Sequence, residues 1–151
     1  MIRILFICHG NICRSTMAEY VMKDLVKKEG LQQQFYISSA GTSREEIGNG
    51  VHYGTRRKLK DEGIPVGDHR AVQLQKEDYK AYDYLIGMDD ANMRNMERIL
   101  HGDREHKLYL LLDFRDWNYP DKTIGVFHQD FEAQYSATTR YVEETFQMLE
   151  K

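Results

Sequence analysis

Residues 2–15 read IRILFICHGNICRS, an apolar run followed by a polar loop and the start of an amphipathic segment. The run over residues 2–7 is typical of a buried strand, because it is short, mostly apolar and rich in isoleucine. After the loop, apolar residues recur at helical spacing as far as Gly30, a residue type that commonly follows a helix. A strand, a loop and a helix in this order predict the first unit of an α/β domain.

The rest of the chain repeats this alternation. Three more strands are predicted at residues 35–38, 83–86 and 108–112, and three more helices at residues 53–62, 92–100 and 131–149. Residues 108–112 are the most continuous apolar run, so we expect them to form a central strand. Residues 113–129 show no clear period and form a long predicted loop, of a kind that is often functional. The alternation predicts one α/β domain over residues 1–151, with a parallel sheet covered by helices on both faces.

The composition excludes several other classes of protein. The 151 residues carry 21 Lys and Arg against 24 Asp and Glu, and the net charge of −3 gives no strong attraction to nucleic acid or anionic lipid. A basic run is therefore interpreted as a solvated helix face; it comprises Arg56, Arg57, Lys58 and Lys60. No apolar run approaches the ~20 residues that span a bilayer. The two cysteines lie in one loop, which argues against a disulfide-rich secreted fold and favours a cytoplasmic protein.

The loop between the first strand and the first helix carries the predicted chemistry. Its residues are Cys8, His9, Gly10, Asn11, Ile12, Cys13, Arg14 and Ser15. Such a loop can curl into a cup whose backbone N–H groups point inward beside a helix N-terminus, so residues 9–15 are predicted to bind phosphate. Gly10 and Asn11 tolerate the positive φ angles of a tight cup. The guanidinium of Arg14 can bind two phosphate oxygens.

Cys8 is the predicted nucleophile. A cysteine beside a helix N-terminus and an arginine is favoured as the thiolate, which can attack phosphorus and carry the phosphoryl group. Ser15 is predicted to donate its hydroxyl to this sulfur and so make it a better leaving group. A zinc site is disfavoured because the two cysteines lack a second pair of ligands, and a nucleotide P-loop because no Gly-Lys-Ser/Thr follows. The chemistry requires no metal and no organic cofactor.

This loop resembles the signature of the low-molecular-weight protein tyrosine phosphatase family, which is Cys, five residues, Arg, and then Ser or Thr near the N-terminus. The family's inner residues Gly-Asn-Ile-Cys-Arg-Ser stand here at residues 10–15. The likeness continues at residues 39–43, 68–71, 83–89 and 130–132, and so covers nearly the whole chain. The resemblance implies a three-layer α/β fold with a four-stranded parallel sheet and a phosphate-binding loop after the first strand. It also implies hydrolysis of protein phosphotyrosine through a phosphocysteine intermediate.

The resemblance further implies supporting roles for residues outside the loop. Asn11 is expected to hold the shape of the loop, acting through His69. Asp89 is expected to help position Arg14. The alternatives are a histidine without such a role at position 69, and an aspartate that only caps a helix at position 89.

The general acid implied by the resemblance lies in the long loop before the last helix. Expulsion of an aryl oxide needs a proton donor near the leaving oxygen, and the family supplies it from an Asp-Pro pair. Asp121 is the best match, although Lys122 follows it in place of proline. Asp113 and Asp116 lie in the same predicted loop and are the competing candidates.

The chain departs from the family pattern at the expected wall of the phosphotyrosine slot. Thr123 and Ile124 stand where aromatic residues usually follow the Asp-Pro pair, and Arg-Glu-Glu at residues 44–46 replaces another common aromatic. Phosphoarginine phosphatases on the same scaffold are therefore an alternative. They tend to carry threonine at the position of Ile12, so Ile12 favours phosphotyrosine. Arsenate reductases are disfavoured, because they need further cysteines after Cys13.

Cys13 is also a predicted redox partner of Cys8. Two thiols on one curled loop can form a disulfide when their Cα atoms come within ~7 Å, and the alternative is a small packing residue. Outside catalysis, the alternative function is an inactive relative that binds phosphate without turnover. The expected partners are phosphotyrosine proteins or small aryl phosphates, not nucleic acid or a membrane, and the chain is expected to be a monomer.

Overall fold

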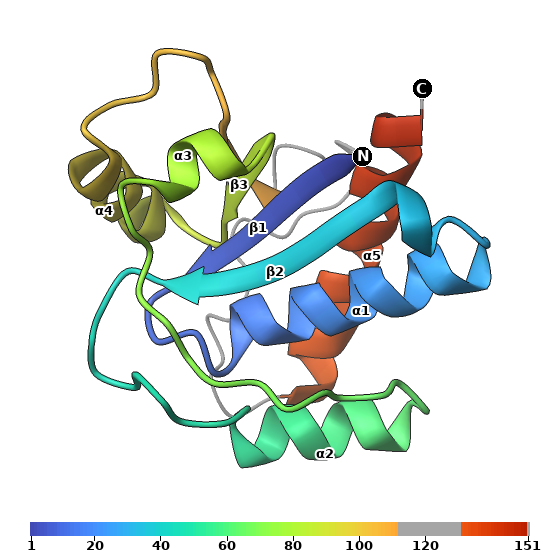
Figure 1. The fold of residues 1–151 in the computed structure, drawn as a ribbon. Helices are drawn as coiled ribbons and strands as arrows, with labels where there is room; N and C mark the ends of the chain where they lie inside the picture. The colour runs from blue at the N-terminus through green and yellow to red at the C-terminus, as the bar shows by residue number, and fades with distance from the viewer. Residues whose placement is uncertain (112–130, 151) are drawn as a thin grey trace.

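The computed structural model describes residues 1–111 and 131–150, which form a parallel sheet with helices on both faces (Figure 1). The strands are β1 (Ile2–Cys8), β2 (Phe35–Gly41), β3 (Tyr84–Gly87) and β4 (Leu108–Leu110), in the order β2-β1-β3-β4. The helices are α1 (Arg14–Lys28), α2 (Tyr53–Asp61), α3 (Asp78–Ala81), α4 (Asp90–Leu100) and α5 (Phe131–Glu150), and a 3₁₀ turn, η1, covers Gln32–Gln34. The predicted α/β class and the four-stranded parallel sheet are confirmed.

Strand β1 lies inside the sheet and packs against a core on each face. Successive side chains of a strand point to opposite faces. Ile4 and Phe6 belong to the core under α1, α2 and α5, whereas Leu5 and Ile7 belong to a second core with α3 and α4. Burial on both faces explains why residues 4–7 form a continuous apolar run rather than an alternating one, whereas Arg3 before them is exposed.

The predicted central position of residues 108–112 is wrong. Among the described strands, β4 lies at the edge of the sheet, where it pairs with β3 alone, and all three of its residues are only half-buried. A continuous apolar run indicates that a strand is covered by helices or neighbouring side chains. An edge strand can be covered in the same way, so the run does not show that the strand is central. Strand order is set instead by the crossover connections, which local sequence does not encode.

The carboxyl ends of three strands meet at one edge of the sheet and position the site. Cys8, the last residue of β1, lies opposite Gly41 of β2, and Ile7 lies opposite Gly87 of β3. Ligands of open parallel sheets bind beyond such ends. The loop predicted at residues 113–129, with Asp121 in it, lies outside the described residues. None of the described helices is long and apolar enough to cross a membrane.

Candidate active site

Cys8 lies at the base of the loop, buried to 3% exposure, with two polar contacts to its sulfur. Its Sγ is 3.1 Å from Ser15 Oγ, and the backbone N–H of Asn11 donates to it over 3.3 Å. The loop thus folds back on the sulfur between the end of β1 and the first turn of α1. When Cys8 is a thiolate, the Ser15 hydroxyl is the donor of the 3.1 Å contact. A Cys8 thiolate in this position would therefore accept from two donors.

Asn11 fixes the shape of the loop through every polar atom of its side chain. It is fully buried and has a φ of 60°, which asparagine tolerates better than most residues. Its Nδ2 donates to Ser15 Oγ over 3.0 Å and to Ser39 Oγ over 2.9 Å, and its Oδ1 accepts from the backbone N–H of Val72 over 3.0 Å. Because Asn11 donates to Ser15, the Ser15 hydroxyl proton is left to point at the sulfur.

His69 holds the same residue from outside, since its Nε2 lies 2.7 Å from the backbone carbonyl oxygen of Asn11. His69, which the resemblance links to Asn11, thus lies within hydrogen-bonding distance of that residue although the two are 58 positions apart in the sequence. A histidine N–H that donates to this carbonyl fixes the peptide group of a residue with positive φ.

Glu19 extends this network, and the sequence analysis missed it. Its carboxylate is buried to 5% exposure and accepts from the Ser39 hydroxyl and, over 2.6 Å, from Lys23 Nζ. A continuous set of hydrogen bonds thus links Glu19, which accepts from Lys23 and Ser39, through Asn11 and Ser15 to the sulfur. The available signal was the spacing, because Glu19 lies four residues after Ser15 and hence on the same face of α1.

Gly41 allows β2 to approach the loop closely. A Cβ at this position would lie 2.8 Å from the His9 carbonyl oxygen and 3.2 Å from the Asn11 backbone nitrogen. The next residues are bonded to the loop, since the N–H of Thr42 donates to the carbonyl of Cys8 and that of Ser43 to the carbonyl of His9. Only glycine fits between these backbones without displacing the loop.

Arg14 begins α1 and is held by a carboxylate from the opposite side of the site. Its Nη1 donates to Asp89 Oδ2 over 2.7 Å, and the two side chains are only 11% and 27% exposed. Asp89 Oδ1 meanwhile accepts from the N–H of Asn92 over 2.7 Å and caps α4. Burial alone would raise the pKa of Asp89, but the Arg14 hydrogen bond and the α4 backbone outweigh it and hold that pKa below its ordinary value. Asp89 therefore contacts Arg14 and caps α4 at the same time, one contact through each carboxylate oxygen.

The rim of the loop is polar and charged. His9 Nε2 lies 3.1 Å from Glu45 Oε2, and both side chains are largely exposed. Glu46 packs beside Gly10, where a Cβ would lie 3.3 Å from its Cγ. The segment in which the sequence lacks an aromatic residue therefore places Glu45 beside His9 and Glu46 beside Gly10, and the Glu46 carboxylate accepts from Asn49 Nδ2 over 2.6 Å.

Cys13 directly precedes α1, five residues after Cys8 in the chain. Neither of the two cysteines, both of which the structure describes, forms a disulfide. Cys13 Sγ is 3.2 Å from Thr55 Oγ1 of α2, and the N–H of His52 donates to the carbonyl of Ile12 over 2.8 Å. These contacts fasten the loop to the start of α2. The predicted general acid Asp121 and its competing candidates Asp113 and Asp116 lie outside the described part of the chain.

Comparison with known proteins places the chain in a family. The family model of low molecular weight phosphotyrosine protein phosphatases matches residues 3–151. The chain belongs to this family. It is 34% identical over 149 residues to the low molecular weight phosphotyrosine protein phosphatase of Saccharomyces cerevisiae, covering 93% of this chain and 90% of the relative.

Solved structures of the family share the fold along the whole chain. The crystal structure of YfkJ from Bacillus subtilis superimposes with a TM-score of 0.92 at 32% identity, covering 99% of this chain and 95% of the other. The structure of DARP, a Drosophila arginine phosphatase, superimposes with a TM-score of 0.85 at 27% identity and 98% coverage of both chains. The similar proteins are thus named for two different side chains, phosphotyrosine in the yeast relative and arginine in the Drosophila phosphatase. Membership of the family establishes that this chain is a cysteine-based phosphatase.

Proposed function

We propose that this phosphatase hydrolyses phosphotyrosine in proteins, and small aryl phosphates, through a phosphocysteine intermediate on Cys8. The observation that carries the proposal is the pair of donors on the buried Cys8 sulfur, from Ser15 and from the Asn11 backbone. An inert core cysteine has no need of such donors, whereas a nucleophilic thiolate does. Arg14, fixed by Asp89 at the other side of the loop, supports the same assignment.

In the first step, the Cys8 sulfur attacks phosphorus opposite the leaving oxygen. An S–P bond forms and the P–O bond to the leaving group breaks. Arg14 and the loop N–H groups bind the three equatorial oxygens, whose charge they stabilise in the transition state. Asp121 is the proposed acid that protonates the leaving oxygen.

In the second step, a water molecule attacks phosphorus and the S–P bond breaks. The electron pair returns to the Cys8 sulfur, where the Ser15 hydroxyl stabilises the thiolate. Asp121, now a carboxylate, accepts the proton of the water, and inorganic phosphate leaves.

The first test is hydrolysis of p-nitrophenyl phosphate, with a chelator present, by the wild type and by Cys8→Ser. We expect turnover by the wild type and none above background by the variant. Retention of phosphate binding by Cys8→Ser, measured by calorimetry, distinguishes loss of the nucleophile from loss of the loop. A folded wild type that binds phosphate without turnover would instead indicate the non-catalytic relative.

Phosphoarginine is the second candidate substrate, and the rim supports it. Glu45 and Glu46 lie at the mouth of the loop and can accept from a guanidinium leaving group. Ile12, in contrast, favours phosphotyrosine over phosphoarginine. Comparison of kcat/KM on matched phosphotyrosine and phosphoarginine peptides decides between them, and we expect the phosphotyrosine peptide to be the better substrate.

Cys13 is the proposed redox partner of Cys8. Peroxide oxidises the Cys8 thiolate to a sulfenic acid, and attack by the Cys13 sulfur then forms a disulfide and releases water. A dithiol reductant restores both thiols, so the wild type should recover activity after peroxide treatment. The Cys13→Ser variant should recover less activity, because the sulfenic acid on Cys8 can then be oxidised further. Equal recovery by the variant and the wild type would refute the proposal.

A further inference from the structure

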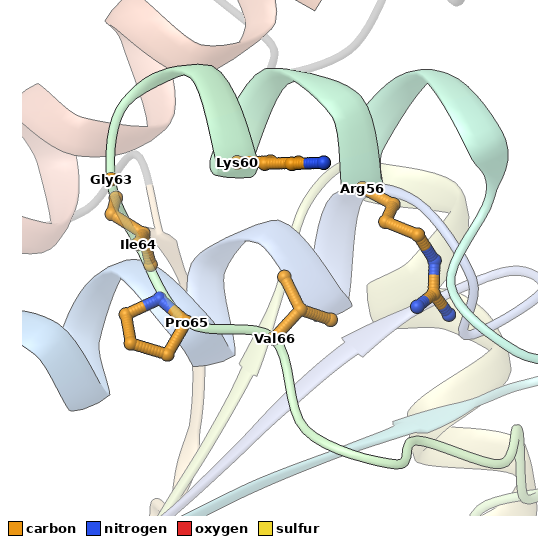
Figure 2. A pocket seen from close by; sticks show the side chains of 6 residues that line it. All are labelled: Arg56, Lys60, Gly63, Ile64, Pro65 and Val66. Carbon is orange, nitrogen blue, oxygen red and sulfur yellow. The ribbon is translucent and has the colours of Figure 1, made fainter.

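The basic run on α2 leaves two cations in a groove that the proposed chemistry does not use. The groove has a volume of about 520 Å³, and Figure 2 shows the residues that line it. They are Arg56, Lys60, Gly63, Ile64, Pro65 and Val66. In Figure 2, Lys60 extends along α2 toward Arg56, with Pro65 and Val66 across the groove from them.

The groove is a fixed part of the fold. The N–H of Gly63 donates to the Lys60 carbonyl over 3.0 Å, and the N–H of Ile64 donates to the Leu59 carbonyl over 2.9 Å. Ile64 is buried to 5% exposure in the core. The chain that forms the second wall is therefore held against the end of α2 rather than lying loose on it.

Arg56 and Lys60 bring two positive charges to the groove. Neither side chain makes a hydrogen bond or an ion pair with another described residue, whereas the neighbouring Lys58 pairs with Glu62 over 2.7 Å. Asp68, after the groove, lies 3.6 Å from Arg70. Since the whole chain carries a net charge of −3, this positive groove is a local exception and not a general property of the surface.

The groove begins close to the loop that holds Cys8. Thr55, which contacts Cys13, precedes Arg56 directly, and Lys60 follows five residues later on the same helix. A helix rises 1.5 Å per residue, so Lys60 lies about 7.5 Å along α2 from Thr55. An extended peptide advances about 3.3 Å per residue, so about two residues of a bound peptide span this length of α2.

We propose that this groove binds an acidic segment of the protein substrate, next to the phosphorylated residue. The carboxylates of the segment pair with Arg56 and Lys60, and an apolar residue packs on Pro65 and Val66. Charge complementarity, the apolar wall and the position beside the loop together favour a peptide over other anions. The proposal rests on the proposed function, because it names the substrate sequence that the same active site would prefer.

The test uses three substrates and two pairs of substitutions. The substrates are p-nitrophenyl phosphate and two phosphotyrosine peptides that differ only in having acidic or basic flanking residues. The groove variant is Arg56→Gln with Lys60→Gln. The matched control is Lys76→Gln with Arg94→Gln, which removes two exposed cations near α3 and on α4, across the sheet (Figure 1).

We expect the wild type to prefer the acidic peptide. The groove variant should lose roughly 3–10-fold in kcat/KM on that peptide through KM, the loss expected for two exposed ion pairs. Its rates on p-nitrophenyl phosphate and on the basic peptide should match those of the wild type and the control. Lys60→Glu should shift the preference toward the basic peptide, which a purely structural role of Lys60 would not do.

Several results would overturn this assignment. One is a wild type that shows no preference for the acidic peptide, and another is a groove variant that loses activity equally on all three substrates. Competition by duplex DNA at equal charge concentration would identify a general polyanion surface instead. If no phosphotyrosine substrate turns over, the proposed function fails by itself, and NMR titration with the unphosphorylated acidic peptide still tests the groove: shifts confined to residues 56–66 support it, and their absence refutes it.

Discussion

Replacement of Asp89 with asparagine separates the two contacts that this carboxylate makes. Oδ1 caps α4 at Asn92, and Oδ2 accepts from Arg14 over 2.7 Å. Asparagine keeps an oxygen for the cap and is as good an N-cap residue as aspartate. Toward Arg14, however, it presents an amide N–H₂ group, so one donor would face another.

The expected loss follows from this geometry. A hydrogen bond to a charged group in a mostly buried setting contributes about 1.5–3 kcal/mol. If that energy serves to hold Arg14 for the phosphoryl group, then kcat/KM falls by about 10–100-fold. The free energy of unfolding should change by less than about 0.5 kcal/mol from the cap, because the cap is conserved.

The assay is kcat/KM on p-nitrophenyl phosphate together with urea unfolding. Asp90→Asn, an exposed neighbour in the first turn of α4, is the control for lost negative charge. Asp89→Ala should lose activity and about 1 kcal/mol more stability than Asp89→Asn, because it removes the cap as well. The reasoning is refuted if Asp89→Asn keeps kcat/KM within about threefold of the wild type while its stability is unchanged.

Three further predictions concern the acid, the loop and a buried tyrosine. Asp121→Asn should lower kcat on aryl phosphates by roughly 10²–10⁴-fold, whereas Asp113→Asn should not; an unaffected rate in the first variant moves the role elsewhere. Gly41→Ala places a Cβ 2.8 Å from the His9 carbonyl oxygen, so unfolding free energy should fall by about 1–3 kcal/mol with a loss of activity. Gly67→Ala meets only ordinary contacts and should be nearly neutral in both measurements. Burial and the nearby Glu19 charge raise the pKa of Tyr20 to about 12, so its contribution to stability is present below pH 10 and is lost as the pH rises toward 12. Tyr20→Phe should therefore lose less stability than the wild type between pH 10 and 12 in urea unfolding, and an equal loss would contradict this account.

The part of the site that the sequence could predict is the part that is local in the chain. Cys8, Arg14 and Ser15 lie within one strand–loop–helix unit, so their spacing alone brings them to one loop. Asp89 lies 75 positions from Arg14, and no local pattern shows that these two meet. Only the family resemblance indicated that pair.

The remaining errors have the same physical origin. Glu19 is not predicted from the sequence, because a charged residue on a helix is normally exposed to solvent. The burial of Glu19 depends on its contact with Ser39, which lies on β2. The apolar character of residues 108–112 predicts a central strand, but apolar character indicates burial and not strand order. Both depend on packing between distant segments, which a single sequence does not specify.

The dependence of the loop on distant partners has a consequence during synthesis. Cys8, the proposed nucleophile, leaves the ribosome early, but His69, Val72 and Asp89, which hold its loop, follow much later. The 75 positions between Arg14 and Asp89 take about 4–15 s to translate at 5–20 residues per second. Over that interval the cysteines of the nascent chain lack the contacts that His69, Val72 and Asp89 make with the loop and with Arg14. The loop therefore reaches its folded shape late, although its own residues are synthesised first.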